Sequence, residues 1–403
     1  MTTTINNEHK KLNVPNLRFP EFQGEWEKTK FGDIATGFDY GMNAAAKNYD
    51  GVNKYIRITD IDEASSTYTD KDIVSPDGIL TDNYLVNNRD ILLARTGAST
   101  GKSYLYKKTD GKLYYAGFLI RANVTTHDPY FVFSQLHTHR YWRWVSIMSA
   151  RSGQPGINSQ EYSSFPIYIT SIEEENKIAK LLSLLDERIA TQNKIIEDLK
   201  KLKSAIIDYA INSLDSGFVK FGSLYEMAGE GGTPTTSNAS FYDHGKIPFI
   251  KIDDLKKKYL TENKDFITEL GLQKSSAWLV PSRSILFSNG ATIGEITITT
   301  YPVCTKQGIL GIVPKPNIDV EFLYYFMSSS YFKKAVSRIV TEGTMKTAYL
   351  KDINNIRCPI PIKEKQQDIA KMPSALNSKI DFEQSILKLF CSQKQYLLRQ
   401  MFM

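Results

Sequence analysis

Residues 94–103, ARTGASTGKS, contain the residue types that hold phosphate groups. The ending G-K-S is typical of a P-loop, in which backbone N–H groups and a lysine cradle nucleotide phosphates. The P-loop pattern places its first glycine five residues before its second. Here that position is Thr96, and Gly97 lies only four residues before Gly101. The spacing therefore argues against nucleotide hydrolysis at this stretch.

The other residue types that support catalysis or metal binding are scattered along the chain. His137 and His139 form an H-x-H pair, which is more often a surface feature than a metal site. Cys304, Cys358 and Cys391 are odd in number and widely spaced, so they match neither a disulfide framework nor a zinc site. We therefore predict a protein without catalytic or metal-binding residues of its own.

The chain repeats itself once, and this repeat gives the glycine stretch its context. Short segments recur in the same order at an offset of about 190 residues. They are KFG at 30–32 and 220–222, YIRITDI at 55–61 and FIKIDDL at 249–255, and NKIAK at 176–180 and QDIAK at 367–371. A constant, domain-sized offset indicates a diverged tandem duplication.

The second copy of the glycine stretch clarifies its role. DILLARTGASTG at 90–101 corresponds to SILFSNGATIG at 284–294, so Glu295 stands in the place of Lys102. A glutamate at that position is incompatible with a phosphate-binding P-loop, whereas the core G-A-x-x-G is shared. We interpret this core as a tight turn that uses glycine for positive φ.

Polar and basic residues around these turns, and in the loop before a proline-flanked strand in each copy, are candidate binding residues. Arginine, asparagine and glutamine read base edges, while serine, threonine and lysine hold phosphates. For any one of these residues, a solvated loop position is the alternative. The candidate DNA-binding residues are Arg57, Arg95, Thr96, Ser99, Lys102, Ser152, Gln154 and Asn158 in the first copy, and Lys251, Ser288, Asn289, Thr292, Thr344, Lys346 and Thr347 in the second.

The segment THRYWRWV at 138–145 interleaves basic and aromatic residues, as in a platform on which bases stack. On a helix such a stripe more often packs against its own domain, and this is the interpretation we favour. One helix is predicted here in each copy, over 130–148 and over 320–339. Asp128 and Pro129 are typical of a helix start.

Each copy closes with a long helix that carries a heptad pattern. Apolar residues in alternating steps of four and three form a seam typical of coiled coils. The seam positions are Leu182, Leu185, Ile189, Ile196, Leu199 and Ile206 in the central helix, and Leu376, Ile380, Leu387, Phe390 and Leu397 in the C-terminal helix. We predict that the two helices pair in antiparallel fashion; the alternative is that each packs only on its own domain. Pro373 is expected to start or kink the second helix.

Length and composition set outer limits on function. With 403 residues the chain is long enough for two or three domains. Its net charge of +6 and pI near 8.8 permit an anionic partner without requiring one. No apolar run reaches the roughly 18 residues that a membrane helix needs, and the start of the chain does not resemble a secretory signal. We therefore expect a cytoplasmic protein.

Tandem strand-rich domains, each followed by a long helix, resemble the specificity subunits of bacterial type I restriction-modification enzymes. The resemblance covers essentially the whole chain. It is carried by the paired turns and by three segments: VPNLRFPEFQGEWEKTKFGDI at 14–34, FPIYITSIEEENKIAKLLSLLDERI at 165–189, and CPIPIKEKQQDIAK at 358–371. Pro373 and Tyr168 depart from the pattern of the family.

The resemblance implies an α+β fold in which two target recognition domains are each followed by a long helix, and the helices pair as an antiparallel coiled coil with pseudo-two-fold symmetry. Each domain would read one half of a non-palindromic, bipartite target in double-stranded DNA. The helices would separate the half-sites and dock two methyltransferase (modification) subunits, joined by two restriction or motor subunits. S-adenosylmethionine, ATP and Mg²⁺ would bind to those partners, and this non-catalytic chain would hold no cofactor.

The predicted ranges are target recognition domain 1 at 1–170 with an N-terminal arm at 1–28, a central spacer helix at 171–213, target recognition domain 2 at 214–362, and a C-terminal spacer helix at 363–403. The alternative function is a coiled-coil scaffold that organises other proteins without sequence-specific DNA binding. Salt-sensitive binding to one bipartite DNA sequence would separate the two possibilities.

Overall fold

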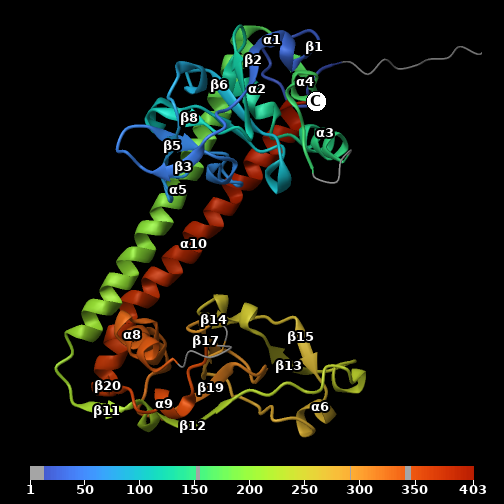
Figure 1. Cartoon of the computed structure of the whole chain (residues 1–403). Coiled ribbons are helices and arrows are strands. Elements are labelled where there is room, and N and C mark those ends of the chain that lie inside the picture. Colours follow the sequence, from blue (N-terminus) through green and yellow to red (C-terminus); the bar gives the residue numbers. More distant parts are fainter. Residues whose placement is uncertain (1–12, 151–154, 291, 341–345) are drawn as a thin grey trace, which may run out of the picture. The chain divides into compact units, whose positions relative to one another are not determined.

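The computed structural model describes residues 13–150, 155–290, 292–340 and 346–403 (Figure 1). The chain forms two compact units, unit 1 (Met1–Asn193 with Ile386–Met403) and unit 2 (Lys194–Ser385). The division falls inside both long helices, so each unit contains a strand-rich domain together with part of each helix.

Unit 1 is built around a four-stranded antiparallel sheet with the strand order β2-β9-β6-β7. Three two-stranded pairings accompany it, β1 with β10, β3 with β5, and β4 with β8, of which the last is parallel. The strands are β1 (Glu27–Lys30), β2 (Ala35–Tyr40), β3 (Ala45–Asn48), β4 (Lys54–Ile56), β5 (Val74–Asp77), β6 (Asp90–Ala94), β7 (Ser103–Leu105), β8 (Leu113–Tyr115), β9 (Leu119–Val124) and β10 (Pro166–Ile169).

Unit 2 contains a five-stranded sheet with the order β12-β19-β16-β17-β14, a three-stranded sheet with the order β15-β13-β18, and the pair β11-β20. The strands are β11 (Phe218–Lys220), β12 (Tyr225–Glu230), β13 (Ile247–Ile250), β14 (Tyr259–Leu260), β15 (Asp265–Ile267), β16 (Ile285–Ser288), β17 (Ile296–Thr299), β18 (Cys304–Thr305), β19 (Ile309–Pro314) and β20 (Arg357–Pro359).

The sequence repeat is a structural repeat. The order β2-β9-β6-β7 in unit 1 corresponds to β12-β19-β16-β17 in unit 2, and the parallel pair β4-β8 corresponds to β13-β18. Both outer pairings contain a register shift, between Gly37 and Asp39 in one unit and between Tyr225 and Met227 in the other. The central strands β6 and β16 are buried along their whole length, including the polar residues Asp90 and Ser288 at their ends.

The helix predicted in the middle of each copy is in fact two helices. Thr138 interrupts the first, because its hydroxyl accepts a hydrogen bond from the N–H of Tyr141 at 3.3 Å and so begins a new helix. Ser329 interrupts the second in the same way, with the N–H of Phe332 at 3.2 Å. The short helices are α1 (Phe31–Ile34), α2 (Pro129–Gln135), α3 (His139–Ser149) and α4 (Ser159–Ser163) in unit 1, and α6 (Glu269–Gln273), α7 (Val320–Ser328), α8 (Ser330–Ile339) and α9 (Leu350–Ile353) in unit 2.

The two long helices, α5 (Ile172–Asn212) and α10 (Lys363–Met401), run antiparallel within each unit. In unit 1, Lys394 forms an ion pair with Asp186 at 2.5 Å. In unit 2, Nζ of Lys203 donates to Oδ1 of Asn377 at 2.9 Å. No predicted seam residue is exposed: Leu182, Leu185, Ile196 and Ile380 are buried, and Ile189, Leu199, Ile206, Leu376, Leu387, Phe390 and Leu397 are half-buried. The predicted α+β fold with two strand-rich domains and two long helices is confirmed.

Pro373 lies inside α10, which begins earlier at Lys363, so the helix does not start at the proline. The next residue, Ser374, joins α10 to the strand-rich part of unit 2. The buried ammonium group of Lys258 donates to Ser374 Oγ at 3.0 Å and to Tyr325 Oη at 2.9 Å, and it pairs with Glu321. Removal of one partner of such a buried, paired charge is strongly destabilising, because the other charge is left without compensation.

The chain segment that follows residue 13 packs onto the start of α5 in unit 1. Arg18 makes a bidentate contact with the buried carboxylate of Glu174, with both nitrogen–oxygen distances at 2.7 Å. Trp26 donates to the same carboxylate at 3.3 Å. Phe402, which follows α10, packs against Trp26 and Phe131 with ring centroids 6.1 Å and 5.4 Å away. Both ends of the described chain therefore belong to the core of unit 1.

Candidate nucleic-acid interface

Turn 1 (residues 94–102) connects β6 to β7 and lies against the loop 155–158. The N–H of Gly97 donates to the carbonyl of Pro155 at 3.0 Å, and the N–H of Ile157 donates to the carbonyl of Arg95 at 2.9 Å. Thr96 and Gly156 form a β-bridge. Two segments that the sequence proposed separately as binding loops therefore form one continuous surface.

Arg95 is held in a defined orientation on this surface. Its guanidinium group lies 4.9 Å from the centre of the Tyr40 ring, and its Nε donates to the carbonyl of Gly117 at 3.1 Å. Among the described residues, no hydrogen bond or ion pair engages its terminal N–H groups. A guanidinium group fixed by an aromatic face, with its fork of donors available, suits bidentate contact with a base edge.

Two exposed aromatic residues flank Arg95 and were not among the predicted contacts. Tyr40 is 44% exposed and Phe118 is 57% exposed. Phe118 is also the residue whose carbonyl accepts a hydrogen bond from the N–H of Arg95 at 3.1 Å. Flat side chains beside an arginine are typical of surfaces that stack on bases. Their sequence pattern does not distinguish them from core residues, so only the fold could identify them.

The framework of turn 1 depends on Gly101, whose φ is +93°. Its carbonyl accepts a hydrogen bond from Tyr141 Oη at 2.8 Å, while Tyr162 Oη donates to the carbonyl of Ala94 at 2.7 Å. Burial raises the pKa of both tyrosine hydroxyls, so they remain protonated donors. In turn 1 the glycine core is thus a tight turn with positive φ at Gly97 and Gly101, as the sequence comparison predicted.

The aromatic segment at 138–145 serves mainly for packing. Tyr141 is fully buried, and Trp144 packs against Phe165 with ring centroids 5.0 Å apart. Only Trp142 is largely exposed among its aromatic residues. The interpretation of this segment as part of the domain core is therefore confirmed, apart from Trp142.

Gly101→Ala should destabilise unit 1 by about 2–4 kcal/mol, since an added Cβ combines positive-φ strain with a clash. That Cβ would lie 2.8 Å from Val145 and 2.9 Å from Trp142. Gly97→Ala is the matched control, because Gly97 also has positive φ but a Cβ added there would meet nothing within 4 Å. Thermal or denaturant unfolding measures both variants; equal losses would contradict this account of turn 1.

Turn 2, with described residues 288–290 and 292–295, shares a backbone contact with turn 1 but has different side chains. The N–H of Ala348 donates to the carbonyl of Asn289 at 2.9 Å, which matches the contact of Ile157 with Arg95. Asn289 is only 1% exposed, and its amide donates to the carbonyl of Ala348 at 3.2 Å. Ser288 is also buried, and its hydroxyl accepts from the N–H of Glu295 at 2.9 Å. In this conformation both predicted contacts are internal, so they support the turn and do not present polar atoms to DNA.

The remaining candidates of the first copy differ in their availability. Lys102 forms an ion pair with Glu63 at 3.2 Å. Asn158 caps α4, since its Oδ1 accepts from the N–H of Glu161 at 2.9 Å. Arg57 contacts Asp60 and Asp72 at 2.8 Å and 3.2 Å, and its hydrogen bond to Asp60 raises the pKa of the guanidinium group.

Some of the predicted residues remain open on the surface. Ser99 and Thr96 are half-buried within turn 1, Thr347 is half-buried beside turn 2, and Thr292 and Lys346 are exposed. Ser152, Gln154 and Thr344 lie outside the described residues.

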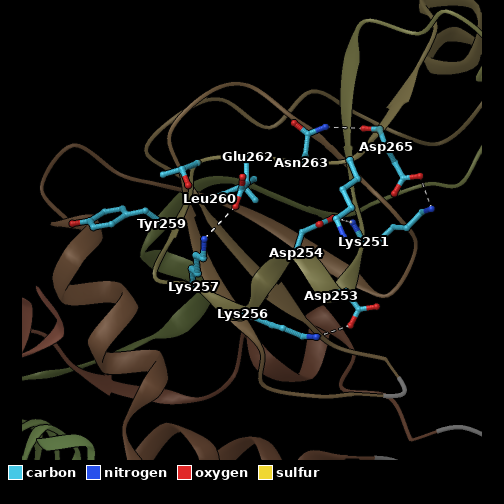
Figure 2. Close-up of a pocket in the computed structure, with 12 residues that line it drawn as sticks. Lys251, Asp253, Asp254, Lys256, Lys257, Tyr259, Leu260, Glu262, Asn263 and Asp265 are labelled. Atoms are coloured by element: carbon cyan, nitrogen blue, oxygen red, sulfur yellow. Dashed lines mark hydrogen bonds and ion pairs between the residues drawn. The ribbon is translucent and has the colours of Figure 1, made fainter. Parts of the chain in front are cut away.

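Lys251 occupies the position in unit 2 that Arg57 occupies in unit 1, since each precedes a 3₁₀ turn whose third residue is an aspartate. It lines an open pocket of about 730 Å³ formed by residues of the segment 251–265 (Figure 2). Lys251 pairs there with Asp265 at 2.7 Å, Lys256 with Asp253 at 3.1 Å, and Lys257 with Glu262 at 3.2 Å. Solvent-exposed pairs of this kind contribute little stability, so an anionic ligand can displace the carboxylates.

Within the described residues, no group of histidine, cysteine, aspartate and glutamate side chains is arranged to hold a metal ion. None of the described helices is long and apolar enough to span a membrane.

Comparisons with known proteins agree with this architecture. The MjaVIII specificity subunit of a type I restriction enzyme from Methanocaldococcus jannaschii is 24% identical over 393 residues, which cover 91% of this chain and 89% of the relative. The HindI specificity subunit from Haemophilus influenzae is 33% identical over 115 residues, or 28% of this chain and 25% of the relative. The crystal structure of a type I restriction-modification S subunit from M. genitalium shares the fold, with a TM-score of 0.58, 16% identity, and coverage of 97% of this chain and 99% of that one.

Residues 23–201 and 214–389 each match the family described as the type I restriction modification DNA specificity domain. Each match contains turn 1 or turn 2, one proline-flanked strand, and most of the long helix that follows. The chain therefore belongs to the family of type I restriction-modification specificity subunits, the non-catalytic subunits that recognise DNA.

Proposed function

We propose that each unit reads one half of an asymmetric, bipartite DNA target. The observation that carries this proposal is the repeated framework with unequal side chains. Arg95 and Asn289 occupy equivalent positions on the two turns, yet one is a positioned cation and the other a buried amide. Equal frameworks with unequal contact groups suit two half-sites of different sequence. Among the described residues, no feature favours a scaffold without DNA recognition.

The same proposal covers the partners of the chain. Two methyltransferase subunits and two restriction or motor subunits would assemble with it on double-stranded DNA in the cytoplasm. S-adenosylmethionine, ATP and Mg²⁺ would bind to those subunits, which supply the methyl transfer, the translocation and the cleavage. This chain would supply the sequence recognition and hold no cofactor itself.

The long helices offer a surface for the methyltransferase subunits. Beyond the seam, each helix carries exposed apolar residues at heptad spacing: Leu181, Ile195, Leu202 and Tyr209 on α5, and Phe382, Leu389 and Tyr396 on α10. We call these residues the outer stripe. Exposed apolar residues in heptad register are typical of a helix that packs against further helices. The outer stripe thus supports docking of helical segments from the partner subunits.

The continuous helix α5 supports a spacer role, because its 41 residues join unit 1 to unit 2 at about 1.5 Å per residue. Insertion of seven residues after Ile196 and seven after Glu383 keeps the heptad pattern of both helices. We expect the gap between half-sites to lengthen by about three base pairs, since seven residues add roughly 10 Å. Both half-site sequences should stay the same.

The methylated motif in the DNA of a host that expresses the chain with its methyltransferase partner measures this result directly. A wild-type chain that directs methylation to no bipartite motif would overturn the proposed function. A changed half-site sequence in the insertion variant would contradict the spacer role alone.

A further inference from the structure

The two units differ at one position of the helix that begins after Thr138 in unit 1 and after Ser329 in unit 2. In unit 1, the residue six places after the capping Thr138 is Trp144, whose ring lies 5.0 Å from Phe165 and 5.9 Å from Tyr162. In unit 2, the residue six places after the capping Ser329 is Ala335. A methyl group fills far less space than an indole ring, so unit 2 has room where unit 1 is packed.

This room is an open pocket of about 540 Å³ between the end of α5, helices α8 and α9, and strand β20. Three basic residues line it, Lys334 and Arg338 from α8 and Arg357 from β20. Asp352 is the one acidic residue among its lining residues, so the pocket carries a net positive charge. Asn355 adds a neutral polar group, and its Oδ1 accepts from the further cation Lys220 at 3.2 Å.

Two of the three cations, Arg338 and Arg357, have no basic counterpart in unit 1. Counted from the caps, Lys334 corresponds to Arg143 and Arg338 corresponds to Ile147. Arg357 pairs with Lys220 in β11, just as Pro166 pairs with Lys30 in β1, so arginine replaces proline at that place. Unit 1 therefore has a cation at only one of these three positions. Its further cation Arg140 replaces the pocket-lining Tyr331, and its guanidinium group is held by the Pro166 carbonyl at 2.9 Å and the Phe165 ring.

The three cations are available to a ligand. Across the described part of unit 2, no carboxylate forms an ion pair with Lys334, Arg338 or Arg357. The guanidinium group of Arg357 is oriented by the Phe218 ring, 5.0 Å from its central carbon. The backbone of Arg357 is held by Tyr331, whose hydroxyl donates to its carbonyl at 2.7 Å. An oriented arginine beside two further cations is the donor set that a phosphate group requires.

We propose that this pocket binds a backbone phosphate of the DNA beside the half-site read by unit 2, and that unit 1 has no counterpart. The inference rests on the proposed function. Its location supports DNA over other anions, because α9 begins at Leu350, two residues after Ala348 binds turn 2. A phosphate contact here adds affinity that is independent of base sequence.

The test uses the chain purified with its methyltransferase partner and duplexes that carry the target or an unrelated sequence. Lys334→Gln combined with Arg338→Gln should weaken binding to either duplex by about tenfold at 0.1 M salt and lower the salt slope by roughly one to two. The preference for the target over the unrelated sequence should not change. Arg143→Gln combined with Ile147→Gln is the matched control in unit 1 and should leave affinity and slope close to wild type.

A second variant removes the space and keeps the charges. Ala335→Trp fills the pocket as Trp144 fills unit 1, and it should reproduce the loss of affinity and of salt slope. Cations near the end of α5 stabilise that helix terminus, so the glutamine substitutions can lower the stability of unit 2. Ala335→Trp keeps these cations and therefore tests the pocket without that effect. Thermal unfolding of each variant monitors that effect.

Unchanged DNA affinity and salt slope in both variants would overturn the proposal that this pocket binds a phosphate. Loss of the methyltransferase subunit during purification would also overturn it, because it would assign the cations to an acidic protein surface. If the wild-type complex shows no sequence preference, the proposed function fails, but the salt slope on unrelated DNA still decides whether the pocket holds a phosphate.

Discussion

Arg95→Ala should lower the affinity for the half-site read by unit 1 by about tenfold or more and relax its sequence at one position, with no effect on the other half-site. A bidentate arginine contact to a base contributes roughly 1–3 kcal/mol of discrimination. Tyr40 and Gly117 hold the guanidinium group in place, so little order must be gained on binding.

The measurement is a comparison of methylated motifs from hosts that express wild-type and variant chains, together with binding to duplexes that differ in one half-site. Lys108→Ala serves as the control, since Lys108 is an exposed cation of unit 1 outside turn 1. The modular arrangement would be wrong if Arg95→Ala altered the recognised bases in both halves. A uniform loss on all duplexes would place Arg95 on a phosphate instead of a base.

Tyr40 and Phe118 extend this prediction. If Arg95 reads a base, the two flanking aromatic side chains are placed to stack beside it, and removal of either should affect the same half-site. The equivalent positions in unit 2 are Glu230, which pairs with Leu310 as Tyr40 pairs with Ile120, and Gly308, whose carbonyl accepts from the N–H of Asn289. The asymmetry of the two surfaces thus includes aromatic residues as well as charge.

Leu202→Asp on α5 and Leu389→Asp on α10 should each reduce copurification of a methyltransferase subunit by more than about tenfold. Both leucines belong to the outer stripe and are 48% and 69% exposed. A carboxylate placed in an apolar helix–helix contact must be buried without a partner, which costs several kcal/mol in binding. Because both side chains face solvent in the free chain, its unfolding free energy should change by less than about 0.5 kcal/mol.

Stoichiometry of the purified complexes, by mass photometry or light scattering, reports this result. Lys201→Ala is the neighbouring control on α5, since Lys201 is exposed and pairs with Glu197 one turn earlier. Normal assembly of both aspartate variants would show that the partners dock elsewhere. Loss of assembly accompanied by a large drop in thermal stability would point to a damaged helix pair.

The burial of the seam residues and their placement on α5 and α10 were predictable from the sequence. Heptad spacing depends only on the order of residues along one chain, and the hydrophobic effect then places that stripe inside a helix pair. The middle helices were less predictable, because a threonine or serine caps a new helix only when the chain bends there. In the folded chain, Thr138 and Ser329 each cap a new helix.

The sequence located segments that lie together in the fold, but it did not show which of their side chains face outward. Turn 1 and the loop 155–158 were both proposed from the sequence, and the structure joins them through the contacts of Gly97 and Ile157. Asn289 looked like a base-reading residue, yet its amide is buried against Ala348. The residue type alone does not show whether an asparagine side chain is buried or exposed. Its role depends on which backbone groups surround it in the fold.

By itself, the sequence of this protein determined the duplication, the shared glycine turn and the long helices, because each is a pattern of residue types along one chain. The tertiary structure decided which polar groups of the turns face outward, which aromatic residues flank Arg95, and where Ala335 leaves a basic pocket that Trp144 closes in unit 1. Those properties depend on contacts between segments far apart in the chain, and the spacing of residues along the sequence does not show which distant segments come into contact.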